Sequence, residues 1–189
     1  MHRKYVYSSD PIVIKLGKWS IEENIREVIF GVEDGAIGNL GLVIGMAQAY
    51  APNTLILLAG LATMLAQFIS MFAGNYLSIK SEKEYFAVRS KNRAYGKAYS
   101  IHKSAFYSSF MMGFSVIIGA IIPLSAFFVF PSHQGIIPSI SITLVGLFAL
   151  GVFKTKYTHR HWFKSGMEVL LVGTIAAAAG YGVGSIFNI

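Results

Sequence analysis

The positions of the basic residues constrain the fold of this chain more than any other feature of its sequence. All 16 Lys and Arg residues fall within three segments, residues 3–26, 80–103 and 154–164. The chain also has five apolar runs that contain neither residue type, at about 28–50, 54–79, 105–130, 136–153 and 168–187. Each run has about the ~20 residues that a helix needs to cross a bilayer. This segregation is typical of a protein that crosses a membrane several times.

The sequence therefore predicts an all-α integral membrane protein with five transmembrane helices in a single membrane domain, residues 1–189. The helices are expected at about residues 21–50, 54–79, 105–130, 136–153 and 167–187. Because short cytoplasmic loops retain the Lys and Arg excess, the basic segments 80–104 and 154–166 and the N-terminus are expected inside, and the C-terminus outside. Pro123 lies within the third run and is expected to kink that helix.

Composition supports a membrane location and argues against several other classes of protein. Charged residues make up 13% of the chain, about half the ~25% of soluble domains, and 54% of the residues are hydrophobic. The net charge of +7 lies on one predicted face, where anionic lipid headgroups explain it, so we expect the bilayer as a partner and no nucleic acid. The chain has no cysteine, which excludes disulfides and thiolate metal sites, and no tightly bound cofactor is expected.

The first apolar run contains two acidic residues, Glu33 and Asp34. A carboxylate at the bilayer centre costs ~2.5–3.5 kcal/mol, so such a residue is expected to face a cavity, a partner or an ion. At about 100° per residue, Glu23 and Glu27 each fall within about 20° of Asp34 around the helix, whereas Glu33 points about 100° away from Asp34. The alternative is that Glu33 and Asp34 only pair with Arg26 near the membrane interface.

Glycines follow the carboxylates on the same face of this helix, at Gly38, Gly41 and Gly45. Because glycine allows close approach of two helix backbones, this face is expected to meet a neighbouring helix, which could be its own copy in a homodimer. The fifth run also repeats small residues, and there close helix packing is the expected role. The repeated glycines in and just before this run are Gly166, Gly173 and Gly180, and Gly184 completes a small-xxx-small pair.

The second run presents a polar and thioether stripe at helical spacing. Its members are Met64, Gln67, Met71, Asn75 and Ser78. A methionine stripe usually indicates packing. However, Asp34 lies about 12 Å inward from Arg26 and Met71 about 13–14 Å inward from Lys80, so two antiparallel helices would place them at one level. A carboxylate oxygen with a thioether sulfur suits borderline divalent first-row metals better than sodium, calcium or magnesium.

Four segments of the sequence together resemble the vacuolar iron transporter family. They are Phe30-Gly31-Val32-Glu33-Asp34-Gly35, Ser70-Met71-Phe72-Ala73-Gly74-Asn75-Tyr76-Leu77-Ser78, Ile122-Pro123-Leu124 and Trp162-Phe163-Lys164-Ser165-Gly166-Met167-Glu168, the last followed by Gly173. The similarity extends from about Ile25 to Phe187. It implies a five-helix protomer and a homodimer with the pathway between the two copies. It also implies export of ferrous iron or manganese from the cytosol in exchange for protons, with cobalt as a further candidate.

The resemblance assigns the metal-ligand positions to Asp34 and Met71. The cytoplasmic entrance and proton coupling would involve Glu23, Glu27 and Glu33, and Gln67 and Asn75 could form a secondary part of the pathway. The chain also departs from the family. It lacks the Glu-rich cytoplasmic domain between the second and third helices, and Asn75 and Thr63 stand where several members have glutamate.

Two other function classes are alternatives to transport. The first is an integral membrane enzyme, because Asp34-Gly35 resembles the start of the phosphatidyltransferase motif. That motif needs further aspartates at positions that Leu42, Val43 and Met46 occupy here, so an enzyme is disfavoured. A non-transporting membrane sensor or structural protein is the other alternative. The compact length and the lack of a visible targeting extension favour a prokaryotic cell membrane over a vacuolar membrane.

Overall fold

The computed structural model describes residues 24–89, 104–158 and 160–187, without the side chains of residues 86–89. This part of the chain forms five long helices and one short 3-10 helix. In chain order they are α1 (Ile25–Gln48), α2 (Asn53–Arg89), α4 (Ala105–Val129), η3 (His133–Gly135), α5 (Ile136–Thr158) and α6 (Trp162–Ile186). Each of the five apolar runs gives one helix long and apolar enough to cross a membrane.

Several helices extend beyond the predicted apolar runs into the basic segments. α2 continues to Arg89, α5 to Thr158, and α6 begins at Trp162. With 37 residues, α2 is about 56 Å long at ~1.5 Å per residue, well beyond the ~30 Å hydrocarbon core of a bilayer. The predicted start of the first helix at residues 21–23 lies outside the described residues.

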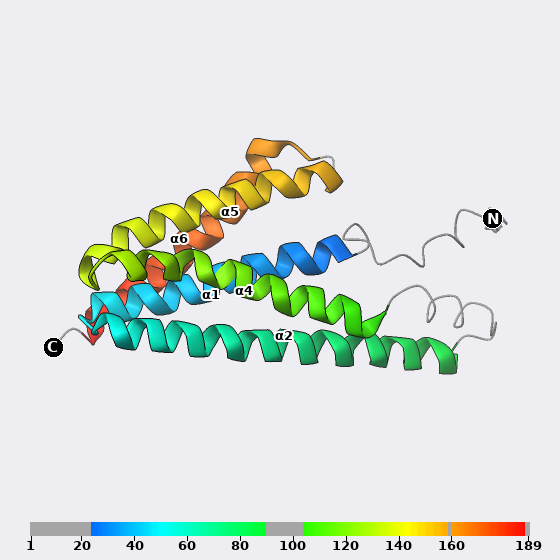
Figure 1. Ribbon diagram of the computed structural model, residues 1–189. Helices are drawn as coiled ribbons and strands as arrows, with labels where there is room; N and C mark the ends of the chain where they lie inside the picture. The colour runs from blue at the N-terminus through cyan, green and yellow to red at the C-terminus, as the bar shows by residue number, and fades with distance from the viewer. Residues whose placement is uncertain (1–23, 90–103, 159, 188–189) are drawn as a thin grey trace.

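Consecutive long helices run in opposite directions through the bundle. One end contains the start of α1, the end of α2, the start of α4, the end of α5 and the start of α6 (Figure 1). We call this the basic end, because all Lys and Arg residues that the structure describes lie toward it. α1 turns into α2 at the opposite end, where Tyr50 adopts a left-handed conformation with φ of 56°.

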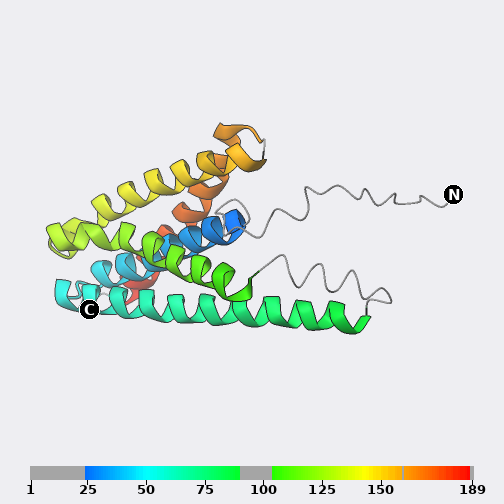
Figure 2. The same cartoon turned by 45° about the vertical axis from the view of Figure 1, so that its right-hand side comes forward.

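α4 is the main neighbour of both α1 and α2. α1 also packs on α6, and α5 pairs with α6, whereas α1 and α2 touch over a much shorter stretch. Figures 1 and 2 both show α5 and α6 diverging from α2 toward the basic end. Sequence analysis predicted α1 and α2 as antiparallel neighbours from their short connector. That orientation is correct, but α4 is the element that each of the two helices contacts most.

The largest apolar core lies toward the end opposite the basic end. It consists of Leu40, Val43, Ile44, Ala47, Ile56, Leu124, Ala126, Phe127, Ile136 and Ala177. Asn53 fastens the start of α2 to the end of α4, because its Nδ2 donates to the carbonyl oxygens of Phe127 and Phe130 at 2.9 and 2.8 Å. The bundle is therefore held together most firmly away from the basic end.

In the half of the α1–α4 contact that lies nearer the basic end, the two helices meet through small residues and not through large apolar side chains. A Cβ added at Gly35 would lie 2.9 Å from the carbonyl carbon of Val116, and one added at Gly119 would lie 2.9 Å from the amide nitrogen of Ala36. A Cβ added at Gly31 would lie 2.8 Å from Cβ of Ser115. These glycines are required because the two backbones are in contact.

Pro123 lies inside α4, as sequence analysis stated. Two neighbouring helices provide polar contacts around it. Asn39 of α1 donates to the carbonyl of Ala120 at 2.9 Å, and the Ser139 hydroxyl of α5 donates to the carbonyl of Pro123 at 2.8 Å. These two buried hydrogen bonds join α4 to α1 and to α5 close to the proline.

Candidate metal-transport site

The acidic residues of α1 occupy different environments. Glu27 is buried, with 4% of its surface exposed, whereas Glu33 and Asp34 are half-buried. Neither Glu33 nor Asp34 forms an ion pair with Arg26 in the described part of the chain. The alternative in which these two carboxylates only neutralise Arg26 therefore has no support. Glu23, the predicted outermost carboxylate, lies outside the described residues.

The contact between Gly38 and Gln67 sets the relative register of α1 and α2. A Cβ added at Gly38 would collide with Nε2 of Gln67 and lie 3.6 Å from its Cδ. Asp34 is four residues before Gly38, and Met71 is four residues after Gln67. In an antiparallel pair both are displaced about 6 Å toward the basic end, so the two lie at the same height.

Gln67 adds an oxygen atom beside this level. Its Oε1 is buried and has no hydrogen-bond partner among the described residues. A buried polar atom without a partner costs free energy, so its retention needs a reason. With the Asp34 carboxylate and the Met71 thioether, the Gln67 amide gives one chain a set of two oxygen donors and one sulfur donor.

The other members of the α2 stripe have different surroundings. Met64 is buried with 8% exposed and belongs to the packed interior. Asn75 lies beside α4, where its Nδ2 is 3.5 Å from the buried hydroxyl of Ser108. Ser78 is exposed. The stripe therefore does not act as one surface, and only its Gln67–Met71 turn is placed at the level of Asp34.

Sequence analysis did not consider Asn39 and Ser108, two buried polar residues near this region. Asn39 Oδ1 has no hydrogen-bond partner within the described chain, while its amide group holds α4. A signal for Asn39 was available, because it follows Asp34 by five residues inside the same apolar run, and polar residues in such runs face the bundle interior. Ser108 had no comparable signal, since serine is common in membrane helices.

The glycine stripe of α1 has close neighbours within the same chain. A Cβ added at Gly180 would lie 3.0 Å from Cα of Gly41, and one added at Gly184 would lie 3.0 Å from the carbonyl carbon of Gly45. Both contacts join α1 to α6. The prediction that Gly38, Gly41 and Gly45 pack against a second copy stays a prediction, but α6 accounts for the close approach at two of them.

The same stripe also borders an open apolar groove of about 650 Å³ between α1 and α6. The α1 residues that line it are Ile37, Gly38, Gly41, Leu42, Gly45, Met46 and Ala49. The Cα of Gly41 faces this groove with room to spare, because an added Cβ would have Ala176 O as its nearest neighbour, at 3.6 Å. Gly41 and Gly45 thus contact α6 on one side and border the open groove on another side.

Comparisons with known proteins show which family the sequence of this chain matches. A sequence model described as the VIT family matches residues 25–96 and 92–185. The chain is 27% identical over 212 residues to Vacuolar iron transporter 1 of Oryza sativa subsp. japonica, covering 85% of this chain and 84% of that protein. It is 27% identical over 210 residues to Vacuolar iron transporter 1 of Arabidopsis thaliana, covering 84% of each.

An archaeal relative is closer in length to this chain. It is an uncharacterized protein of Methanocaldococcus jannaschii, 30% identical over 166 residues that cover 83% of this chain and 86% of the relative. The alignment to the rice protein, at 212 residues, exceeds the 189 residues of this chain, so the plant protein contains internal residues that this chain lacks. The two segments matched by the family model meet at residues 92–96, between α2 and α4.

Proposed function

This chain is a member of the VIT family, the vacuolar iron transporters, and from that membership we propose that it moves divalent transition-metal ions across a membrane. Ferrous iron is the first candidate, since the named relatives are iron transporters, and manganese and cobalt are further candidates. The proposed direction is out of the cytosol in exchange for protons. Membership favours transport over the enzyme and sensor alternatives.

The shared height of Asp34 and Met71 is the observation that supports this proposal most directly. The Gly38–Gln67 contact brings a carboxylate and a thioether to one level of two antiparallel helices. A mixed hard and soft donor pair binds borderline first-row ions and discriminates against calcium and magnesium, which prefer shells of oxygen atoms. Gln67 would supply an additional oxygen.

A homodimer with the pathway between its copies would complete the coordination of the metal. In the described residues, no group of three or more His, Asp and Glu residues lies close enough together to hold an ion. One copy offers Asp34, Met71 and Gln67, fewer than the four to six ligands that these ions usually take. A second copy related by two-fold symmetry would double the set, and the open groove beside α1 supports that arrangement.

Metal and proton would be coupled because both bind the same carboxylate oxygens. A metal ion at Asp34 excludes a proton from it, and a proton at Asp34 excludes the metal. Glu27 and Glu33 would receive ions near the basic end, where Glu23 is also expected. We further propose a prokaryotic cell membrane as the host, supported by the archaeal relative, which aligns without a long insertion.

Transport in liposomes tests this function. The purified full chain is reconstituted into vesicles containing a metal-quenched dye and a separate pH indicator. Ferrous, manganous, cobaltous and calcium ions are then supplied one at a time, with and without an imposed pH gradient. We expect quenching by ferrous iron and no calcium flux, with proton movement opposite to the metal. Metal flux that ignores the pH gradient and moves no protons would replace exchange with a uniport, and no flux of any transition metal would overturn the proposed function.

A further inference from the structure

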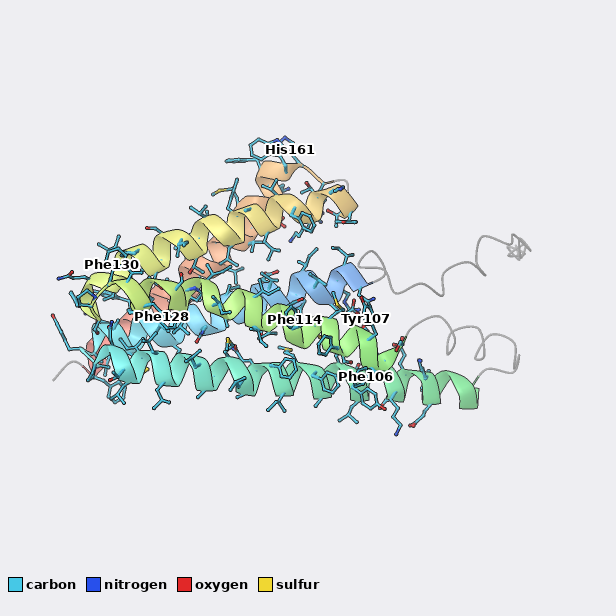
Figure 3. All side chains as sticks on the ribbon, viewed as in Figure 1. Phe106, Tyr107, Phe114, Phe128, Phe130 and His161 are labelled. Carbon is cyan, nitrogen blue, oxygen red and sulfur yellow. The ribbon has the colours of Figure 1, made fainter. Side chains whose placement is uncertain are left out.

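A second polar cavity lies at the connection between α5 and α6, apart from the α1–α2 site. Its volume is about 200 Å³. The residues that line it are Arg160, His161, Lys164, Ser165 and Glu168. Figure 3 shows His161 at the outer edge of this connection, on the far side of the bundle from α2. We call this cavity the α6 pocket.

Residues of the first turn of α6 line the α6 pocket. His161 is the N-cap residue but its side chain makes no capping hydrogen bond. The amide of Ser165 donates to the carbonyl of His161 at 3.1 Å, which closes the first turn. The amides of residues 162–164 precede this bond and have no carbonyl partner in the helix itself. Together with the helix dipole, they favour a negatively charged ligand.

Ser165 provides a second and independent indication of a ligand. This residue is only 1% exposed, lines the α6 pocket, and its Oγ has no hydrogen-bond partner in the described structure. The backbone of Ser165 packs closely against Gly151 of α5, since a Cβ added at Gly151 would lie 2.7 Å from the carbonyl oxygen of Ser165. This contact fixes the position of the turn. A hydroxyl buried without a partner is costly, and an oxygen atom of a ligand in the pocket that Ser165 lines would accept its hydrogen bond.

The charges of the α6 pocket favour an anion over a cation. Arg160 and Lys164 are the two Lys and Arg residues of the pocket, and Glu168 is the one carboxylate among the lining residues. Glu168 lies 3.5 Å from Arg160, with both side chains largely exposed, so this ion pair is weak and can open. A phosphate group has enough acceptor oxygens for the guanidinium, the ammonium, the backbone amides and the Ser165 hydroxyl.

We propose that the α6 pocket binds a phosphate group, supplied by the headgroup of an anionic phospholipid or by phosphate in solution. The lipid source fits the neighbouring surface. Trp162 and Phe163 are 54% and 51% exposed, and exposed aromatic residues at helix ends lie at the level of lipid headgroups. The pocket is separate from Asp34 and Met71, so its occupancy does not depend on the proposed transport.

Native mass spectrometry and calorimetry of the full chain in detergent test the proposal. The probes are phosphatidylglycerol, diacylglycerol as the phosphate-free lipid, and inorganic phosphate. Lys164→Gln should weaken phosphatidylglycerol binding about fivefold, the effect of one basic residue near an anionic surface. Ser165→Ala should weaken it roughly tenfold, the effect of a hydrogen bond to a charged group. Lys156→Gln is the matched control, because Lys156 is exposed on the neighbouring turn of α5 but does not line the pocket.

Glu168→Gln gives the sharpest discrimination. Removing this carboxylate frees Arg160 and should tighten binding of the phosphate-bearing probe. Binding of phosphatidylglycerol but not diacylglycerol identifies a lipid source, and binding of inorganic phosphate alone identifies a soluble source. The proposal is overturned if Lys164→Gln and Lys156→Gln have equal effects, if Glu168→Gln weakens binding, or if neither probe responds to the Ser165 and Lys164 substitutions. Lys164 and Glu168 are exposed, so these variants should fold normally.

Discussion

At the scale of single residues, a carboxylate within a membrane-spanning helix persists only where an interaction compensates its desolvation. Asp34 has no cationic partner in the described structure, and its neighbour in height on α2 is a methionine. In the proposed site, this carboxylate is the negative charge that a metal ion would neutralise, and Met71 would provide selectivity. These two roles lead to separate predictions.

Asp34→Asn should reduce metal transport in liposomes to background, because an amide keeps the shape of the side chain but removes the charge that attracts the ion. Folding and assembly should be retained, as measured by gel filtration and native mass spectrometry. Glu84→Gln is the matched control, since Glu84 is exposed near the end of α2 and outside the proposed pathway. Uptake by the Asn variant at the wild-type rate would remove Asp34 from the site.

Met71→Leu should lower transport of ferrous and cobaltous ions by about tenfold, while thermal stability changes little. Leucine conserves volume, and such swaps usually cost less than ~1.5 kcal/mol, but it has no sulfur donor. Met64→Leu is the control on the same helix, because Met64 is buried in packing. Equal transport by the two Leu variants would give Met71 a packing role only.

At the scale of helices, glycines decide which elements touch. The α1–α4 contact depends on Gly31, Gly35 and Gly119, and the α1–α6 contact on Gly180 and Gly184. In lipid, apolar side chains provide little preference for one neighbour over another, so close packing of small residues selects the partner. Steric changes at these glycines should therefore disrupt the bundle more than changes to larger apolar residues that face lipid.

Gly35→Ala should destabilise the protein by about 1–3 kcal/mol, because the new methyl group meets the Val116 backbone, which cannot move aside. Gly74→Ala is the matched substitution on α2, where an added Cβ meets nothing within 4 Å. That variant should be neutral or more stable by ~0.5–1 kcal/mol, since alanine is the better helix former. Thermal unfolding in detergent compares the two, and similar melting temperatures would contradict the tight α1–α4 contact.

Sequence reasoning was most reliable where hydrophobicity and spacing act along one helix. The apolar runs identified the five long helices that the structure describes. The common level expected for Asp34 and Met71 agrees with the register of the Gly38–Gln67 contact, while their role as metal ligands stays a prediction. It could not identify α4 as the main neighbour of α1 and α2, because a stripe of glycines does not specify which helix approaches it. The α1 glycines were expected to meet a neighbouring helix, which could be a second copy. Gly180 and Gly184 of α6 lie against two of them, and contact with a second copy stays a prediction.

At the scale of the whole molecule, the proposed dimer places a second copy against the groove between α1 and α6, where that copy would complete the metal site. Its α1 side has no bulky residue at Gly41, and an added side chain would point into the groove. Gly180, in contrast, faces the backbone of α1 of the same chain. Substitutions at these two glycines therefore separate assembly from folding.

Gly41→Leu should yield a folded monomer without transport, because the side chain fills the groove needed by the second copy. Gly180→Ala should reduce the yield of folded protein, because its methyl group collides with the carbonyl of Gly41 in the same chain. Native mass spectrometry measures the assembly state, and thermal unfolding measures the fold. An intact, active dimer of Gly41→Leu would show that the groove is not the dimer interface.

The α1–α4 glycine contact also affects how genetic screens of this protein should be interpreted. A screen that scores only metal tolerance in cells will recover substitutions at Gly31, Gly35 and Gly119 beside those at Asp34 and Met71, since a chain that fails to fold also fails to transport. Measuring protein abundance for each variant separates the two groups. The glycine variants should be depleted from the membrane, whereas variants of the acidic and thioether residues should accumulate at normal levels and remain inactive.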